Sequence, residues 1–341
     1  MGALGECVNN LKDYDEDDFR SRPGKHKSRP RSKDRPKFEN AVTGLVVTVD
    51  RGRFTVHLTS PEEIDIYAIK ARELGRKGVI VGDLVEIVGV DTKNIENMAR
   101  IVKVNERKNS LQKSADDSES VERSLVANID MVAIVVATAE PEPNPRLIDR
   151  TIIAARLANA QPIIIATKTD IESPQKLSEM YQALDIPVFS VNKTSTLEEL
   201  LDVLENKTTV LIGPSGVGKS TLVNRLVPDA NRRTGEVNDV TGQGKHTSTS
   251  AFALKINKTT WIIDTPGIRS FGLAHATVEE ILEGFPDLVQ ATTDCQKGCS
   301  HQDTSCAIEA MAFENPALLP RLDSFRRLIS SLDSSEGRVS I

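Results

Sequence analysis

The sequence of 341 residues has few cysteines, few aromatic side chains and no long apolar run. Four cysteines, three of them within twelve residues, exclude a framework of disulfides and indicate metal-binding spacing. The longest apolar stretch covers nine residues, 131–139, well short of the ~18 that a membrane span needs. The first twenty residues are polar and acidic and lack the apolar core of a secretory signal. We therefore expect a cytoplasmic protein with no membrane span.

Basic residues gather in one segment, although the net charge is −6. Between Arg20 and Lys37, nine lysines or arginines stand against one acid, Asp34, and an acidic cluster at 13–18 precedes them. With three prolines and few apolar residues, residues 1–39 cannot bury enough surface to fold alone, so we predict a disordered charged tail. The tail is either simply solvated or an arm that contacts RNA, since dense positive charge on a flexible segment gains affinity by releasing counterions.

Residues 40–105 show the period-two alternation of short strands, which we predict at 43–49, 54–58, 64–68, 84–88 and 100–104. Five such strands predict a small closed barrel of the oligonucleotide-binding (OB) type. Only Phe54 and Tyr67 could stack on bases, so base-specific binding of single strands is not expected. Contact with folded RNA through Lys and Arg stays open, as does a barrel without a ligand.

Two changes in sequence pattern divide the rest of the chain. The polar stretch 106–124 predicts a linker, and from 125 to 284 apolar strands alternate with helices, which is typical of a parallel α/β domain. We expect its strands at 131–136, 162–166, 187–191, 209–212, 252–256 and 261–263, and its helices at 145–159, 196–205, 219–226 and 278–284. Residues 285–341 are expected to form a metal-binding C-terminal module with helices.

The phosphate-binding motif G-x-x-x-x-G-K-[S/T] occurs once, after a predicted strand and at the start of a predicted helix. We call residues 213–220 the phosphate loop. Its glycines let backbone N–H groups face phosphates, Lys219 would reach the β- and γ-phosphates, and the Ser220 hydroxyl would bind Mg²⁺. The predicted nucleotide-binding residues here are Gly213, Pro214, Ser215, Gly216, Val217, Gly218, Lys219, Ser220 and Thr221.

Residues 264–267 read Asp-Thr-Pro-Gly at the end of a later strand. There Asp264 could hold Mg²⁺ and the Gly267 N–H could sense a γ-phosphate. The other interpretation is an ordinary turn after a strand, which the phosphate loop makes the weaker one.

Two loops at strand ends could read the base. Thr167, Lys168, Thr169 and Asp170 resemble the N-K-x-D signature that recognises guanine, in which the Asp carboxylate accepts from the base and the Lys stem covers its plane. We call residues 167–170 the first base loop. Ser190 and Val191 lie at the end of the next strand and, with Asn192, form the second base loop, 190–192. Both precede the phosphate loop, whereas ordinary GTPases have the reverse order, so the domain is predicted to be circularly permuted.

The cysteines predict a second site. Cys295, Cys299, His301 and Cys306 offer three thiolates and an imidazole in the density of a tetrahedral structural zinc site, with no open position for catalysis. The alternative is three free cysteines and a surface histidine.

A five-stranded barrel, a permuted GTPase domain and a Cys-Cys-His-Cys module together resemble the ribosome small subunit-dependent GTPase A family over about residues 40–315. Two departures are Thr167, where the family usually has Asn, and three residues instead of four between Cys295 and Cys299; we expect neither to abolish its site. The resemblance implies GTP hydrolysis stimulated by the small ribosomal subunit late in its maturation, with rRNA contact. We expect a monomer that binds GTP or GDP, Mg²⁺ and one zinc ion.

Catalysis needs a group that orients water, and Ile268, directly after the Asp-Thr-Pro-Gly segment, cannot hydrogen-bond one. His246, in the Gly-rich loop 235–250, is the candidate, and Thr247 or Thr249 would complete the Mg²⁺ shell. His246 could equally be a solvent-exposed loop residue. Two other functions are compatible with the motifs: an RNA-binding scaffold with a merely structural nucleotide site, and an unrelated P-loop ATPase or kinase.

Overall fold

The structure is a computed structural model. It describes residues 40–60, 63–75, 78–92, 97–114, 122–182, 185–228, 251–266 and 277–336. The predicted tail, 1–39, lies outside the described residues. No helix in the described ranges is long and apolar enough to cross a bilayer.

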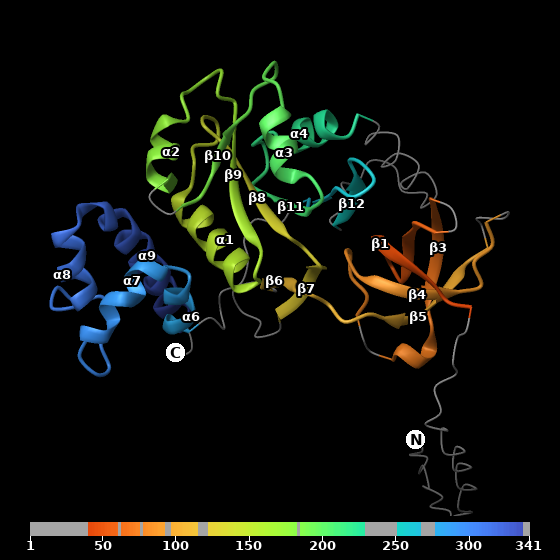
Figure 1. Ribbon diagram of the computed structural model, residues 1–341, viewed down its shortest axis with the longest axis horizontal. Coiled ribbons are helices and arrows are strands. Elements are labelled where there is room, and N and C mark those ends of the chain that lie inside the picture. The colour runs from red at the N-terminus through yellow and green to blue at the C-terminus, as the bar shows by residue number, and fades with distance from the viewer. Residues whose placement is uncertain are drawn as a thin grey trace, which may run out of the picture. The chain divides into compact units, whose positions relative to one another are not determined.

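The first five strands close into a barrel (Figure 1). They are β1 (Val42–Asp50), β2 (Arg53–Leu58), β3 (Ile64–Lys70), β4 (Leu84–Val88) and β5 (Ala99–Val104), with a short 3₁₀ helix, η2 (Arg72–Leu74), after β3. Their order is β1-β2-β3-β5-β4, and β4 pairs back with β1. Alternate apolar residues such as Val46, Val56, Val85 and Ile101 fill the interior. The five predicted strands and the barrel are therefore confirmed.

The stretch predicted as a linker contains part of a β-hairpin. It consists of β6 (Ser110–Ser114) and β7 (Glu122–Ala127), which pair antiparallel. Leu111 and Val126 are buried in the main core, and the Ala127 N–H donates to the Val81 carbonyl at 2.9 Å. The hairpin was not predicted, because β6, Ser-Leu-Gln-Lys-Ser, has a single apolar residue and no alternation is visible in the sequence.

The α/β domain is built on six strands in the order β10-β9-β8-β11-β13-β12. In chain order they are β8 (Met131–Ala137), β9 (Gln161–Thr167), β10 (Val188–Ser190), β11 (Thr208–Ile212), β12 (Phe252–Lys255) and β13 (Trp261–Asp264). The first five in the sheet are parallel, and β12 is antiparallel to β13. All six match predicted strands.

Helices cover both faces of this sheet (Figure 1). They are α1 (Pro145–Leu157), α2 (Gln175–Gln182), α3 (Glu198–Leu204) and α4 (Lys219–Leu226). Because side chains alternate along β8, Val132 and Ile134 join the core shared with α1 and α2, whereas Ala133 and Val135 join the core shared with α3 and α4. The helix α2 was not predicted.

One strand of the barrel pairs with one strand of the α/β domain. Thr48 of β1 lies opposite Phe252 of β12, and Phe252 lies opposite Asp264 of β13. Nearby, Lys255 forms an ion pair with Glu63 at 2.7 Å. The barrel and the α/β domain therefore share one continuous sheet, in which β12 lies between β1 of the barrel and β13, the strand that ends at Asp264.

Short helices follow the sheet in the C-terminal part. They are α6 (Val278–Glu283), α7 (Pro286–Val289), η3 (Gln290–Asp294), α8 (Ala307–Glu314), η4 (Pro316–Leu318) and the long α9 (Leu319–Glu336). Thr277 and Glu280 form a capping box that begins α6. The rings of Phe285 and Phe325 pack edge to face at 5.7 Å, in the same core as α1. The predicted helical module is thus present.

Candidate functional site

The phosphate loop runs from the end of β11 into α4. Gly216 and Gly218 have φ of +83° and +92°, which favours glycine strongly over residues with a Cβ. A Cβ on Gly213 would lie 2.3 Å from the Val135 carbonyl oxygen, so the loop passes too close to β8 for any side chain there. β11 lies between β8 and β13 in the sheet, which places the loop and the start of α4 at the carboxyl edge where a nucleotide binds in such folds.

Lys219 and Asp264 form the charged centre of this edge. Burial lowers the pKa of the Lys219 ammonium, while the charge of Asp264 acts in the opposite direction. The Nζ atom of Lys219 donates a hydrogen bond to the Gly213 carbonyl at 2.5 Å. Burial raises the pKa of Asp264, partly offset by Lys219 and by the Thr265 N–H. The ammonium of Lys219 thus lies folded onto its own loop.

The Asp264 carboxylate fits a divalent cation. It is only 7% exposed, and its Oδ1 is buried with no hydrogen-bond partner among the described residues. The neighbouring Thr265 fixes the turn by donating from Oγ1 to the Leu211 carbonyl at 2.8 Å. An unpaired buried carboxylate oxygen is costly, and a hard cation with oxygen ligands would satisfy it. The Ser220 hydroxyl, exposed at the start of α4, is a second oxygen of the required kind.

The first base loop is tied to the phosphate loop. Thr167 is buried at the end of β9, and its Oγ1 donates to the Val217 carbonyl at 2.5 Å. Thr138 donates from Oγ1 to the Lys168 carbonyl at 2.9 Å. Asp170 is exposed, free to meet a base edge. The threonine that replaces the usual asparagine thus connects the two loops through its hydroxyl, although it has no amide.

The second base loop is held by α4. Asn192 Oδ1 accepts from the backbone N–H groups of Thr194 at 2.9 Å and Ser195 at 2.7 Å, which closes a tight turn. Arg225 donates from α4 to the carbonyls of Asn192, at 2.5 Å, and Ser195. One helix therefore begins at the phosphate loop and positions the second base loop. Neither Arg225 nor Thr138 was expected from the sequence, because no motif marks a side chain that bonds to a distant carbonyl.

Several predicted residues lie outside the described part of the chain. They are His246, Thr247 and Thr249 in 229–250, and Gly267 and Ile268 in 267–276. Their roles stay predictions.

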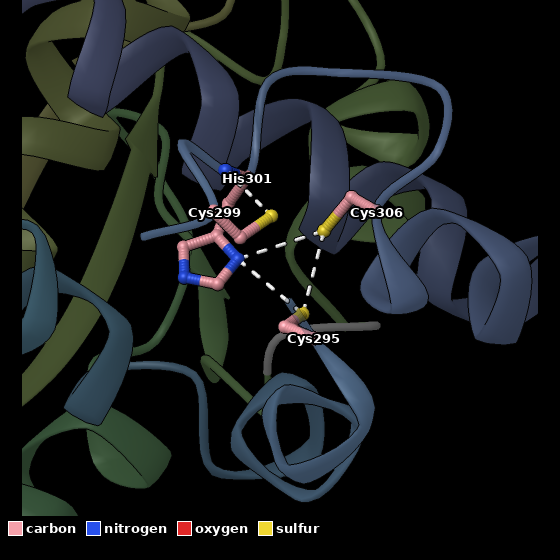
Figure 2. Close-up of side chains that lie close together, drawn as sticks. All are labelled: Cys295, Cys299, His301 and Cys306. Carbon is pink, nitrogen blue, oxygen red and sulfur yellow. Dashed lines mark hydrogen bonds between the residues drawn. The ribbon is translucent and has the colours of Figure 1, made fainter. Parts of the chain in front are cut away.

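The predicted metal ligands come together in the C-terminal part (Figure 2). The Sγ atoms of Cys295 and Cys306 are 3.8 Å apart, and His301 Nδ1 lies 3.7 Å from the first and 3.5 Å from the second. The ligand atoms of the cluster, Cys299 included, lie within 4.8 Å of one another. Ligands bound to zinc at ~2.3 Å stand about 3.8 Å apart along the edges of a tetrahedron. These spacings fit one metal ion and are far longer than a disulfide.

The cluster is anchored by its surroundings. Cys306 is buried at the start of α8, and burial raises the pKa of its thiol to about 11. Burial lowers the pKa of His301, which favours the neutral imidazole that binds metals. Arg326 of α9 donates to the His301 and Asp303 carbonyls, both at 3.2 Å, and to the Glu309 carboxylate. The ligand loop is therefore fixed to α9.

Comparison with known proteins decides the family. The model of the family described as RsgA GTPase matches residues 104–274. A small ribosomal subunit biogenesis GTPase RsgA from Agathobacter rectalis is 31% identical over 313 residues, covering 86% of this chain and 99% of that protein. The chain belongs to the RsgA GTPase family. GTP hydrolysis is therefore the activity that the site must perform, and the resemblance inferred from the motifs is confirmed.

Solved structures confirm the architecture. The crystal structure of YjeQ from Thermotoga maritima is similar with a TM-score of 0.66 at 24% identity, covering 86% of this chain and 98% of that chain. That of YloQ, described as a circularly permuted GTPase, gives 0.64 at 21% identity, covering 87% and 96%. The barrel, the permuted GTPase domain and the Cys-rich C-terminal cluster of an RsgA GTPase are thus all present.

Proposed function

We propose that this RsgA GTPase hydrolyses GTP during maturation of the small ribosomal subunit and that the subunit stimulates hydrolysis. The observation that carries the nucleotide part is the Thr167–Val217 hydrogen bond, which joins a base loop to the phosphate loop as a single preorganised site. The assignment to the small subunit rests on the names of relatives such as the Agathobacter rectalis protein.

Guanine is the proposed base. Asp170 accepts from the guanine edge, the Lys168 stem covers the base plane, and Thr167, Thr169, Ser190 and Val191 shape the pocket. A bound base that covers these polar groups and leaves them unpaired costs about 1–3 kcal/mol for each group. GTP and GDP should therefore bind far better than ATP.

The phosphates are held by the backbone of residues 213–221, by the N-terminus of α4 and by Lys219, which would leave the Gly213 carbonyl for the β- and γ-phosphates. Ser220 and Asp264 would hold Mg²⁺, with Thr247 and Thr249 completing its shell. Bound there, Mg²⁺ would neutralise charge on the transferring phosphoryl group. Gly267 would donate its N–H to the γ-phosphate.

Water activation is proposed for His246. Because Ile268 cannot orient water, basal turnover is expected to be slow, and docking on the subunit would bring the histidine into position. Its removal should lower stimulated turnover more than nucleotide affinity.

Zinc is the proposed metal of Cys295, Cys299, His301 and Cys306, in a structural role, since the four ligands leave no open position. We further propose a cytoplasmic monomer that contacts rRNA.

Turnover of GTP and of ATP, each measured with small subunits, with large subunits and alone, tests the proposal. We expect small subunits to accelerate GTP hydrolysis and large subunits to leave its rate unchanged. Equal rates with either subunit would refute the assignment of the partner, and equal affinities for ATP and GTP in a direct titration would refute base recognition by Asp170. Bound GTP without any turnover would favour the scaffold.

A further inference from the structure

A cavity of about 750 Å³ lies between α1 and α9. Its charged lining consists of four arginines and two aspartates: Arg146, Arg150, Arg326, Arg327, Asp149 and Asp323. None of these belongs to the phosphate loop, the base loops or the metal cluster. The volume falls in the range of sites that bind small molecules, and the net charge of the lining is positive.

Two of the arginines already form hydrogen bonds with acceptors of the protein. Arg327 donates to Asp149 Oδ2 from Nη2 at 2.7 Å and from Nε at 3.2 Å, which neutralises that carboxylate. Arg326 bonds the Glu309 carboxylate and two carbonyls next to the metal cluster. Both guanidinium groups keep further N–H donors.

The other two arginines have no acid partner among the described residues. Arg146 and Arg150 stand one turn apart on α1, so they share a face of the helix. Arg150 Nε is buried and has no hydrogen-bond partner in the part of the chain that the structure describes. A buried donor without an acceptor costs free energy that a bound acceptor would recover.

Their position on the helix adds to this cost. Arg146 and Arg150 lie in the first two turns of α1, whose first turn carries no acidic residue. The N-terminus of a helix has a partial positive charge that fades within the first turn, so the charge of Arg146, the second residue of α1, is unfavourable there. Asp323 of α9 also lines the cavity and is exposed, and with it the charge of the lining is still positive.

We propose that the cavity between α1 and α9 binds a phosphate group through Arg146 and Arg150. Guanidinium groups pair with phosphate oxygens through two parallel N–H bonds. No described carboxylate or carbonyl accepts such a pair of bonds from Arg146 or Arg150. The backbone of RNA and a free phosphorylated small molecule present the same chemistry. The site is separate from the nucleotide site and stands independently of the proposed ribosomal role.

The test is calorimetric titration of the full-length protein. Mg²⁺ and a non-hydrolysable GTP analogue saturate the phosphate loop, and the probes are inorganic phosphate and a short mixed-sequence RNA duplex. Arg146→Gln/Arg150→Gln is compared with Lys176→Gln/Lys258→Gln, which removes the same charge from exposed positions on α2 and after β12. Basal GTP turnover and thermal unfolding should be unchanged in both variants.

We expect the arginine variant to bind a probe at least tenfold more weakly than the wild type, and the lysine variant to stay within twofold. Loss confined to inorganic phosphate would identify a free phosphorylated ligand. Loss for the duplex, with a salt slope reduced by about 1 per lost contact, would identify the RNA backbone. If the double variant is less stable, Arg146→Gln alone, at an exposed position, repeats the test. Equal binding of both probes by wild type and arginine variants would overturn the proposal.

Discussion

Arg327 holds α9 on the GTPase domain, and replacing it by leucine should loosen that helix. Its partner, Asp149 of α1, is 1% exposed, and its Oδ1 also accepts from the Tyr181 hydroxyl of α2 at 3.0 Å. Arg327→Leu keeps an apolar stem of similar length but removes both N–H bonds to Oδ2. The carboxylate would stay buried with the tyrosine as its strongest remaining donor.

The expected loss follows from the burial of the pair. Removing one partner of a buried ion pair costs about 3–5 kcal/mol. Because the Arg327 side chain is 36% exposed, water partly solvates its ion pair with Asp149. We therefore take the lower end of this range, a loss of about 3 kcal/mol. That corresponds to about 150-fold more frequent opening of α9 at pH 7. Native-state hydrogen exchange, followed on peptides from α9, measures this opening.

The loss should shrink as the pH falls. Burial raises the pKa of Asp149, and Arg327 counters that rise, so the pKa in the variant should lie higher still. A carboxyl group with a raised pKa stabilises the fold below its unfolded pKa, and that contribution is lost as the pH rises through the folded pKa. Arg146, Arg150, Arg326 and Asp323 face the same cavity in both proteins, so comparison at equal pH cancels their effects.

The controls separate charge from packing. Arg327→Leu/Asp149→Asn removes the buried charge together with its partner. Hydrogen exchange of α9 in this double variant should be closer to that of the wild type, and the deficit relative to the wild type should be the same at pH 7 and pH 5. Exchange of α9 in Arg327→Leu within threefold of the wild type at pH 7 would refute the reasoning. So would a deficit that is the same at both pH values.

Three further predictions concern the two sites. Lys219→Ala should lower GTP turnover about 10²–10³-fold, as loss of a preorganised charge on a phosphate does, and unchanged single-turnover kinetics would contradict its role. Thr167→Val should weaken GDP binding about tenfold by calorimetry, because the Val217 carbonyl loses its hydroxyl donor, whereas Thr167→Ser should bind like the wild type. Protein purified without chelator should contain one zinc per chain by elemental analysis, and Cys306→Ser should contain less and lose protection around residues 295–306; metal-free wild type would contradict this.

Short-range patterns made most of the architecture predictable. The phosphate loop and the metal ligands are recognisable because their chemistry requires certain residues at fixed spacing within a few positions. The apolar strand β8 and the alternating barrel strands were equally clear, since burial on one or both faces leaves its period in the sequence.

What the sequence did not reveal depends on contacts between distant segments. The β6–β7 hairpin is stabilised by Leu111 and Val126 in a core formed by other elements, not by its own pattern. Asp149 is an ordinary helical acid until α9 places Arg327 against it, 178 positions away. The link from Thr167 to Val217 likewise spans 50 positions. Single side chains that bond across such distances carry no local signal.

The pairing of β1 with β12 means that the barrel covers part of an edge of the GTPase sheet. Without β1, the backbone groups on the outer side of β12 (Phe252–Lys255) would form an open sheet edge, and open edges recruit strands from other molecules. The strand is only four residues long and ends in a lysine, which limits this tendency without removing it. A chain shortened to begin at Glu106, which removes the barrel and keeps β6 and β7, should therefore be prone to self-association through β12. In the full protein, the barrel covers this edge where Thr48 of β1 pairs with Phe252, the first residue of β12.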